Sequence, residues 1–229
     1  MRVHILALAL ALAAGTAAAH DDKDEHGNVD RVNGGIHIDA NETAGDLSTV
    51  NGGITVGSGA QVKSVETVNG GVRLSDGARA HSVETVNGGV RLGENAQVGQ
   101  DAETVNGGID LAKGADVAGR VENVNGGITL DHAHVGGGIK TVSGDVTVGE
   151  GSTVDNGIKV ERPTGWFNGL FGTSNNRPPR IVIAANAVVN GTLTFERDVE
   201  LFVHESAKIG SVTGATPKRY TGALPPKEQ

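Results

Sequence analysis

The tetrapeptide Val-Asn-Gly-Gly occurs six times in this chain, and successive copies lie 18 or 19 residues apart. The copies begin at Val32, Val50, Val68, Val86, Val105 and Val124, and the variant Val-Ser-Gly-Asp follows at Val142. A unit this short cannot bury a hydrophobic face on its own, so it must stack on further copies of itself. The repeat therefore excludes a string of independent domains.

Each repeat divides into three segments of six residues, with an aliphatic residue recurring at every sixth position. In the repeat from Val50, the apolar residues Ile54 and Val56 flank Thr55, which is the period-two alternation of a strand. Gly and Asn cluster between such pairs, where the chain must turn. The pattern predicts an all-β fold, a parallel β-solenoid with about 18 residues and three short strands per coil, and leaves its handedness open.

The same phase runs along most of the chain and predicts about nine coils over residues 32–212. A loop insertion at 161–180 interrupts it, and the segments 20–31 and 213–229 are expected to be tails. The repeats from Val86 and Val105 carry one extra residue each. A bulged corner just before the next tetrapeptide, as at 101–104, would absorb it.

The first nineteen residues have the pattern of a signal peptide. Met1-Arg2 is basic, residues 5–14 are apolar, and Ala17-Ala18-Ala19 offers a cleavage site. We predict cleavage after Ala19 and a periplasmic or secreted protein. The chain has no cysteine, which excludes disulfides and a lipid-modified cysteine, and the mature chain has no stretch near the ~20 apolar residues of a transmembrane helix.

Charge argues against nucleic acid as a partner. The whole chain has a formal net charge of −8, and without Arg2 the mature chain would carry 18 Lys and Arg against 27 Asp and Glu. Phosphate backbones are bound by basic surfaces, and the acidic balance favours solubility over a specific cationic partner.

Stacking turns repeated residues into columns. We expect the tetrapeptide valines to point inward between two outward polar columns, one of asparagine and one of threonine. These are Asn33, Asn51, Asn69, Asn87, Asn106 and Asn125, and Thr49, Thr67, Thr85, Thr104 and Thr141. Asparagine amides can hydrogen-bond from coil to coil. The threonine column resembles the repeated threonines of ice-binding β-solenoids, which keeps an ice- or surface-binding role open.

A fourth column is acidic and consists of Glu66, Glu84, Glu103 and Glu122. Its repulsion requires an offset, either from the neighbouring basic residues Lys63, Arg73, Arg91 and Arg120 or from a divalent cation. We favour salt bridges, because the chain has no Gly-Gly-x-Gly-x-Asp calcium motif.

The histidines give no metal prediction, because neither of their two groups offers three ligands at fixed spacing. The groups are His20 and His26 with the nearby aspartates, and His132 with His134. No nucleophile motif, phosphate loop or acid-base pair stands out, so we expect no catalytic residues, no cofactor and no enzymatic activity.

The insertion holds the chain's single tryptophan within an apolar group that is costly to expose. Its members are Trp166, Phe167, Leu170 and Phe171. They are expected to pack on the solenoid itself or to contact a partner, and they are the candidate contact site of the chain.

Three resemblances bear on function. Residues 92–97 resemble the hexapeptide repeat of left-handed β-helices, several of which are acyltransferases, but no histidine here matches a catalytic position. Residues 65–74, 83–92 and 140–148 resemble exported adhesin-like β-solenoid domains of bacteria, a family of unknown function. Residues 181–210, with Val189-Asn190-Gly191-Thr192-Leu193, are similar to the polymer-forming bactofilins.

The adhesin-like resemblance implies an exported, non-enzymatic structural or adhesin-like module of the bacterial cell envelope. The bactofilin resemblance implies the alternative, a periplasmic scaffold that assembles end to end. The expected partners are accordingly another copy of the chain, an envelope protein or a surface.

Overall fold

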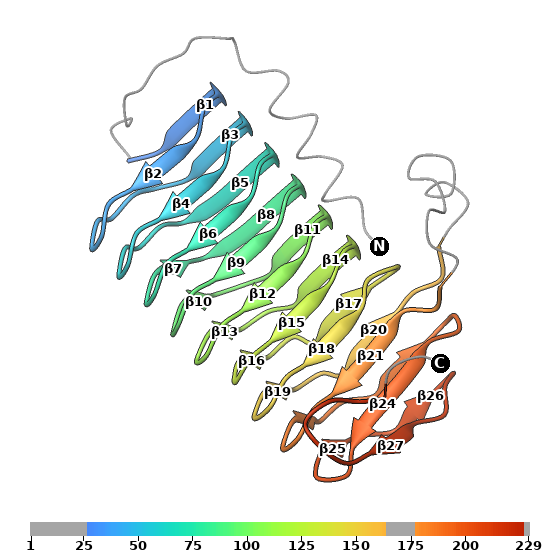
Figure 1. Cartoon of the computed structure of the whole chain (residues 1–229). Coiled ribbons are helices and arrows are strands. Elements are labelled where there is room, and N and C mark those ends of the chain that lie inside the picture. Colours follow the sequence, from blue (N-terminus) through green and yellow to red (C-terminus); the bar gives the residue numbers. More distant parts are fainter. Residues whose placement is uncertain (1–26, 164–176, 227–229) are drawn as a thin grey trace.

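The computed structural model describes residues 27–163 and 177–226. Within these ranges every regular element is a strand, and the strands wind into a parallel β-solenoid of about nine coils with three strands per turn (Figure 1). The predicted fold is confirmed.

The strands form three parallel sheets, which we name A, B and C. Sheet A contains β1 (Val29–Asn33), β3 (Leu47–Asn51), β5 (Ser64–Asn69), β8 (Ser82–Asn87), β11 (Ala102–Asn106), β14 (Val121–Asn125), β17 (Ile139–Thr141), β20 (Ile158–Val160), β23 (Leu193–Phe195) and β26 (Val212–Thr213). Sheet B contains β2 (Ile36–Ile38), β4 (Ile54–Val56), β6 (Val72–Leu74), β9 (Val90–Leu92), β12 (Ile109–Leu111), β15 (Ile128–Leu130), β18 (Val146–Val148), β21 (Arg180–Ile183), β24 (Glu200–His204) and β27 (Lys218–Tyr220). Sheet C contains β7 (Arg79–Ala80), β10 (Gln97–Val98), β13 (Asp116–Val117), β16 (His134–Val135), β19 (Thr153–Val154), β22 (Val188–Val189) and β25 (Lys208–Ile209).

The core is a stack of inward-facing aliphatic residues from all three sheets. Ile54, Leu74, Leu92 and Ile109 of sheet B are among the largest side chains that are fully buried. Burial of one such side chain stabilises the fold by ~1.5–3 kcal/mol, and stacking repeats that contribution in each coil. The repeat therefore builds a continuous core from strands of only two to six residues.

The corner between sheets A and B explains the Asn-Gly-Gly sequence. The amide of each asparagine donates to the asparagine of the preceding coil, as Asn69 Nδ2 does to Asn51 Oδ1 at 3.0 Å, which confirms the predicted ladder. Coils approach so closely here that a Cβ on Gly88 would lie 2.0 Å from the carbonyl oxygen of Gly70. Only glycine fits such a position.

The orientation predicted for the tetrapeptide valine is wrong. The threonine before it points inward, and Thr49, Thr67 and Thr104 are completely buried, whereas the valines lie on the outer face of sheet A. The threonine hydroxyl is satisfied inside the core, because it donates to a corner glycine carbonyl of the preceding coil, as from Thr67 to Gly52 at 2.8 Å. A buried hydroxyl with such a partner costs little, so strand alternation decides the orientation.

The solenoid extends beyond both expected boundaries. Strand β1 begins at Val29, inside the segment expected as the tail 20–31, and β27 lies inside the segment expected as the tail 213–229. Strand β27 pairs with β24 in the parallel register of sheet B, so the chain after Thr213 still winds around the axis. Strands β20 and β21 flank the insertion expected at 161–180.

The extra residue lies at the corner between sheets C and A. Val98 is paired with Ala80, 18 residues earlier, whereas Ala102 is paired with Val83, 19 residues earlier. The additional residue therefore falls between Val98 and Ala102, as predicted. It widens this corner in the coils that follow.

Candidate functional site on the outer face of sheet A

Two columns of side chains point away from the core on sheet A. The first contains, in consecutive register, Glu66, Glu84, Glu103, Glu122, Lys140 and Lys159. The second contains the tetrapeptide valines, of which Val105, Val124 and Val142 form an apolar cluster separate from the main core. The predicted glutamate column is confirmed, and its charge reverses between β14 and β17.

Glu103, in the acidic part of this column, has a pKa close to neutral pH. Burial, followed by the charges of Glu122, Glu84 and Asp101, raises the pKa of Glu103 from 4.5 to about 7. Burial and the neighbouring Glu84 also raise the pKa of Glu66. Burial, together with the stacking of carboxylates one strand apart, therefore leaves Glu103 partly protonated near pH 7.

Arg120, one of the basic residues predicted to offset the glutamates, lies next to the acidic column. Its Nη1 atom is 2.8 Å from Glu122 Oε1, close enough for an ion pair but outside hydrogen-bond geometry. Its Nη2 atom donates to Asp101 Oδ2 at 3.0 Å. Arg73 and Arg91 instead lie on the outer face of sheet B, where Arg91 pairs with Asp110.

The basic part of the column belongs to a network of ion pairs. Lys140 Nζ lies 3.3 Å from Glu161 and 3.9 Å from Glu122. Lys159 Nζ lies 3.1 Å from Glu161 and 2.9 Å from Glu196, and these carboxylates raise its pKa. These ion pairs hold both lysine side chains in place on the outer face of sheet A.

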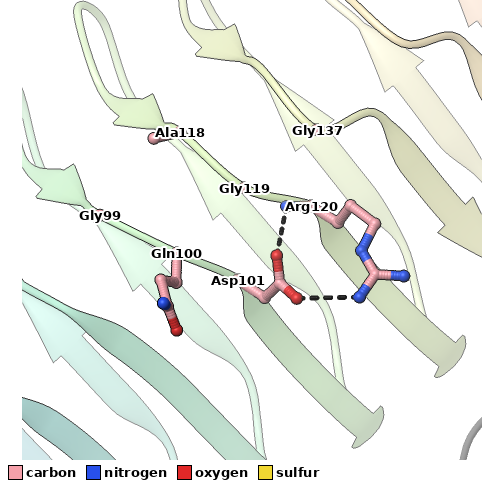
Figure 2. A pocket seen from close by; sticks show the side chains of 7 residues that line it. All are labelled: Gly99, Gln100, Asp101, Ala118, Gly119, Arg120 and Gly137. Carbon is pink, nitrogen blue, oxygen red and sulfur yellow. Dashed lines mark hydrogen bonds and ion pairs between the residues drawn. The ribbon is translucent and has the colours of Figure 1, made fainter.

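A shallow pocket of about 510 Å³ opens at the widened corner beside the acidic column (Figure 2). It is lined by Gly99, Gln100, Asp101, Ala118, Gly119, Arg120 and Gly137. Asp101 and Arg120 face each other across adjacent coils, and Asp101 Oδ1 also accepts the backbone N–H of Arg120 at 2.7 Å. A Cβ on Gly119 would lie 2.3 Å from Asp101 Oδ1, so glycine keeps the corner open. The extra residue thus creates a small polar hollow.

His134, on the outer face of sheet C, lies between two carboxylates. Its Nδ1 is 2.5 Å from Asp116 Oδ1 and its Nε2 is 2.9 Å from Asp155 Oδ2. Both ring nitrogens can donate only in the imidazolium form, and the two carboxylates raise the pKa of His134 accordingly. His134 therefore links three successive coils by charge.

Several predicted sites are placed elsewhere or lie outside the described residues. The threonine column is inside the core, which removes the observation behind the ice-binding alternative. His132 pairs with its neighbour Asp131 rather than with His134. Over residues 27–163 and 177–226, no group of three or more His, Cys, Asp or Glu residues is arranged to hold a metal ion. Trp166, Phe167, Leu170, Phe171, His20 and His26 lie outside the described residues.

Sequence reasoning missed Lys140, Lys159 and the pocket. The lysines could have been found, because Lys140 follows Glu122 by 18 residues and Lys159 follows Lys140 by 19. They occupy the next two steps of the same column. The pocket gives no such signal, since its shape depends on how three coils stack.

In the described part of the chain, no helix has the length and apolar character needed to cross a membrane. Comparison with known proteins finds no family model, no curated protein and no solved structure that matches this chain.

Proposed function

We propose that this chain is an exported, non-enzymatic structural or adhesin-like module of the bacterial cell envelope, which works by presenting the outer face of sheet A. The observation that supports it is the pair of ordered columns on sheet A, of which the charge column runs over six consecutive hydrogen-bonded strands from β5 to β20. A surface of this kind holds its charges at fixed spacing, ~4.8 Å from strand to strand.

Rigidity of the face follows from the contacts between coils. Neighbouring coils are bonded through the backbone of the parallel sheets, and the coils built from the tetrapeptide are bonded also through the asparagine ladder and the buried threonines. Side chains on such a frame lose little further entropy when a partner binds. The proposed mechanism is therefore the presentation of charges at fixed positions to a partner.

Export and contact can be tested together. We expect cells to release the chain into the periplasm or the medium with His20 as its first residue, which mass spectrometry would detect. The purified protein should co-sediment with bacterial envelope fragments, and Glu84→Lys on sheet A should weaken this at least threefold. Arg73→Glu, a charge reversal on sheet B, is the matched control. Retention of Met1 in the cytoplasm, or equal effects of both variants, would count against the proposal.

End-to-end assembly is the second candidate, and the strands at the sheet ends favour it. Sheets A and B end at β1 and β2 on one side and at β26 and β27 on the other, all in the same parallel sense. Edge strands of this kind can template pairing with a second copy.

Two arginines in inward columns oppose that assembly. Arg31 is in register with the buried Thr49 and donates to the carbonyl of Gly35. Arg219 is in register with the buried Val203 and donates to the carbonyl of His204 at 3.3 Å. Stacking another solenoid on either end would bury a charged guanidinium, and removing that charge from water is costly. We therefore favour the presented face over the filament.

Negative-stain electron microscopy over a range of concentrations separates the two candidates. We expect short rods of about 40 Å, the length of about nine coils at ~4.8 Å each. Arg31→Val combined with Arg219→Val should then produce longer particles. Filaments of the unmodified protein would instead make the end-to-end scaffold the leading function.

A further inference from the structure

The outward charge column of sheet A is self-complementary. Glu103 and Glu122 lie on β11 and β14, and Lys140 and Lys159 lie at the equivalent positions of β17 and β20. A two-fold axis parallel to the strands, between β14 and β17, turns the face over and reverses the order of the coils. That operation places Glu122 opposite Lys140 of a second copy, and Glu103 opposite Lys159.

We propose that the outer face of sheet A is a homotypic docking surface that binds a second copy of this chain in this antiparallel, face-to-face arrangement. Its contacts are isologous, because each copy contributes the same patch. The inference goes beyond the proposed function and can be tested on the purified protein alone.

The balance of charge supports the second copy as the occupant. On the acidic side, the column has four carboxylates, and the positive charge of Arg120 offsets one of them. On the basic side, Glu161 and Glu196 balance Lys140 and Lys159 in number, and two further cations lie there. Arg162 bonds the carbonyl of Glu196 at 3.1 Å, and Arg197 bonds the carbonyl of Val142 at 3.1 Å. The two halves thus carry opposite net charge.

The valine column lies beside the charge column and shares the same axis. It runs two residues further along each strand, and the two-fold places Val124 opposite Val142 of the second copy. Val105, Val124 and Val142 already pack on each other and are only 3–7% exposed, so they add little apolar surface. The contact between the two copies therefore rests on the charge column.

The two-fold axis between β14 and β17 overlaps the eight strands from β5 to β26 and leaves β1 and β3 outside the contact. Eight strands ~4.8 Å apart, each contributing about four residues of ~3.3 Å, give on the order of 500 Å². This is below the ~800 Å² per partner of a standard interface and has the size of a weak, reversible contact. Because charges dominate this contact, salt should weaken the dimer.

Analytical ultracentrifugation of the purified protein, as cells process it, tests the proposal. We expect a monomer–dimer equilibrium whose dissociation constant rises at least tenfold from 50 to 500 mM NaCl. Glu103→Lys alone and Lys159→Glu alone should each abolish the dimer, since each faces like charges across the interface. An equimolar mixture of the two variants should restore it, because both opposite-charge pairs return.

Arg73→Glu on sheet B is the control and should leave the dimer unchanged, and thermal melting of each variant checks that it is folded. A strictly monomeric unmodified protein would overturn the proposal. So would single variants that still dimerise, a mixture that stays monomeric, or species that grow past the dimer with concentration, which indicate end-to-end stacking.

Discussion

The coils built from the tetrapeptide and the last coils of the solenoid solve the same packing problem differently. From β3 to β14, the second inward column of sheet A is Thr49, Thr67, Thr85, Thr104 and Asn123. From β20 onward, the same column holds Val160 and Phe195. The tight glycine of the neighbouring corner disappears as well, since Pro163 and Asp198 follow β20 and β23 at the equivalent positions.

The difference shows that the inward threonine and the corner glycine depend on each other. Each inward threonine donates to a corner carbonyl of the preceding coil, as Thr104 does to Gly88 at 2.8 Å. Where the corner is no longer built from paired glycines, that acceptor is lost and an apolar side chain fills the space. The repeated coils are thus stabilised by the same threonine–glycine hydrogen bond in each coil, whereas the last coils are packed by different apolar side chains.

The last coils also use their outer face differently. Val182, Phe202 and Tyr220 form an apolar cluster on the outside of sheet B. The guanidinium of Arg180 lies 4.8 Å from the centre of the Phe202 ring and the ammonium of Lys218 lies 5.3 Å from it. Cations over an aromatic ring stabilise this contact without a repeated ladder.

The largest effect is expected from breaking the glycine corner. Gly88→Ala should destabilise the fold by at least ~3 kcal/mol or prevent folding, because its Cβ would lie 2.0 Å from the carbonyl oxygen of Gly70. Urea denaturation measures the loss. In the control Gly89→Ala, the nearest atom is the oxygen of Gly108 at 3.1 Å, and the cost should be clearly smaller. Equal costs would show that the close approach is not the cause.

Exchanging threonine and valine in the inward column of sheet A should destabilise the fold less than breaking the glycine corner. Val160→Thr places a hydroxyl in a fully buried position of a coil without the glycine corner, and we expect a loss of about 1–2 kcal/mol. Thr104→Val removes the hydrogen bond to Gly88, at a cost of about 1 kcal/mol. Thermal and urea melts compare the two. If Val160→Thr is neutral, the threonine does not depend on the glycine corner.

The acidic column gives a pH-dependent prediction. The pKa of Glu103 is about 7 in the folded protein, above its ordinary value of 4.5, so the folded state binds the proton more tightly than the unfolded state. Wild-type stability should therefore fall as the pH rises from about 4.5 through 7. Glu103→Gln should be more stable than the wild type at pH 8, by on the order of 1 kcal/mol after solvent screening, and not at pH 4.5.

Urea melts at the two pH values measure this difference. Glu94→Gln, the same substitution at an exposed corner, is the control. The interpretation fails if Glu103→Gln has the same advantage at both pH values.

The smallest effect is expected at His134. Its pKa is raised by Asp116 and Asp155, so its stabilising charge is present below its ordinary value of about 6.5 and is lost as the pH rises through the folded value. His134→Gln should lower stability at pH 6 by a few tenths of a kcal/mol and approach the wild type at high pH. His81→Gln, at an exposed position, serves as the comparison in thermal melts. A larger loss at high pH would reverse the sign and exclude the charged link.

Much of the architecture could be predicted from sequence because the repeat constrains every coil alike. The spacing of Val50, Val68 and Val86 predicts the period, and the extra residue near Asp101 was correctly placed at a corner. The facing of the valine could not be settled in the same way. Threonine and valine alternate along the strand, and apolarity alone favours valine inside. The available glycine carbonyl, which belongs to the preceding coil, reverses that preference.

The candidate site also combines features that the sequence predicts with features that depend on how the coils stack. The glutamate column follows from sequence spacing, and the lysines that continue it are readable at the same steps. The pKa of Glu103 and the pocket beside Arg120 depend on distances between coils, which no single repeat contains.

By itself, the sequence determined a parallel β-solenoid, its period, its asparagine ladder and its acidic column, because a short repeat can bury its apolar residues only by stacking. Only the tertiary structure decided that threonine faces the core, that the solenoid extends through Tyr220, and that burial and neighbouring charges raise the pKa of Glu103. Those features arise from contacts between residues about 15 to 20 positions apart, and such contacts exist only once the coils are stacked.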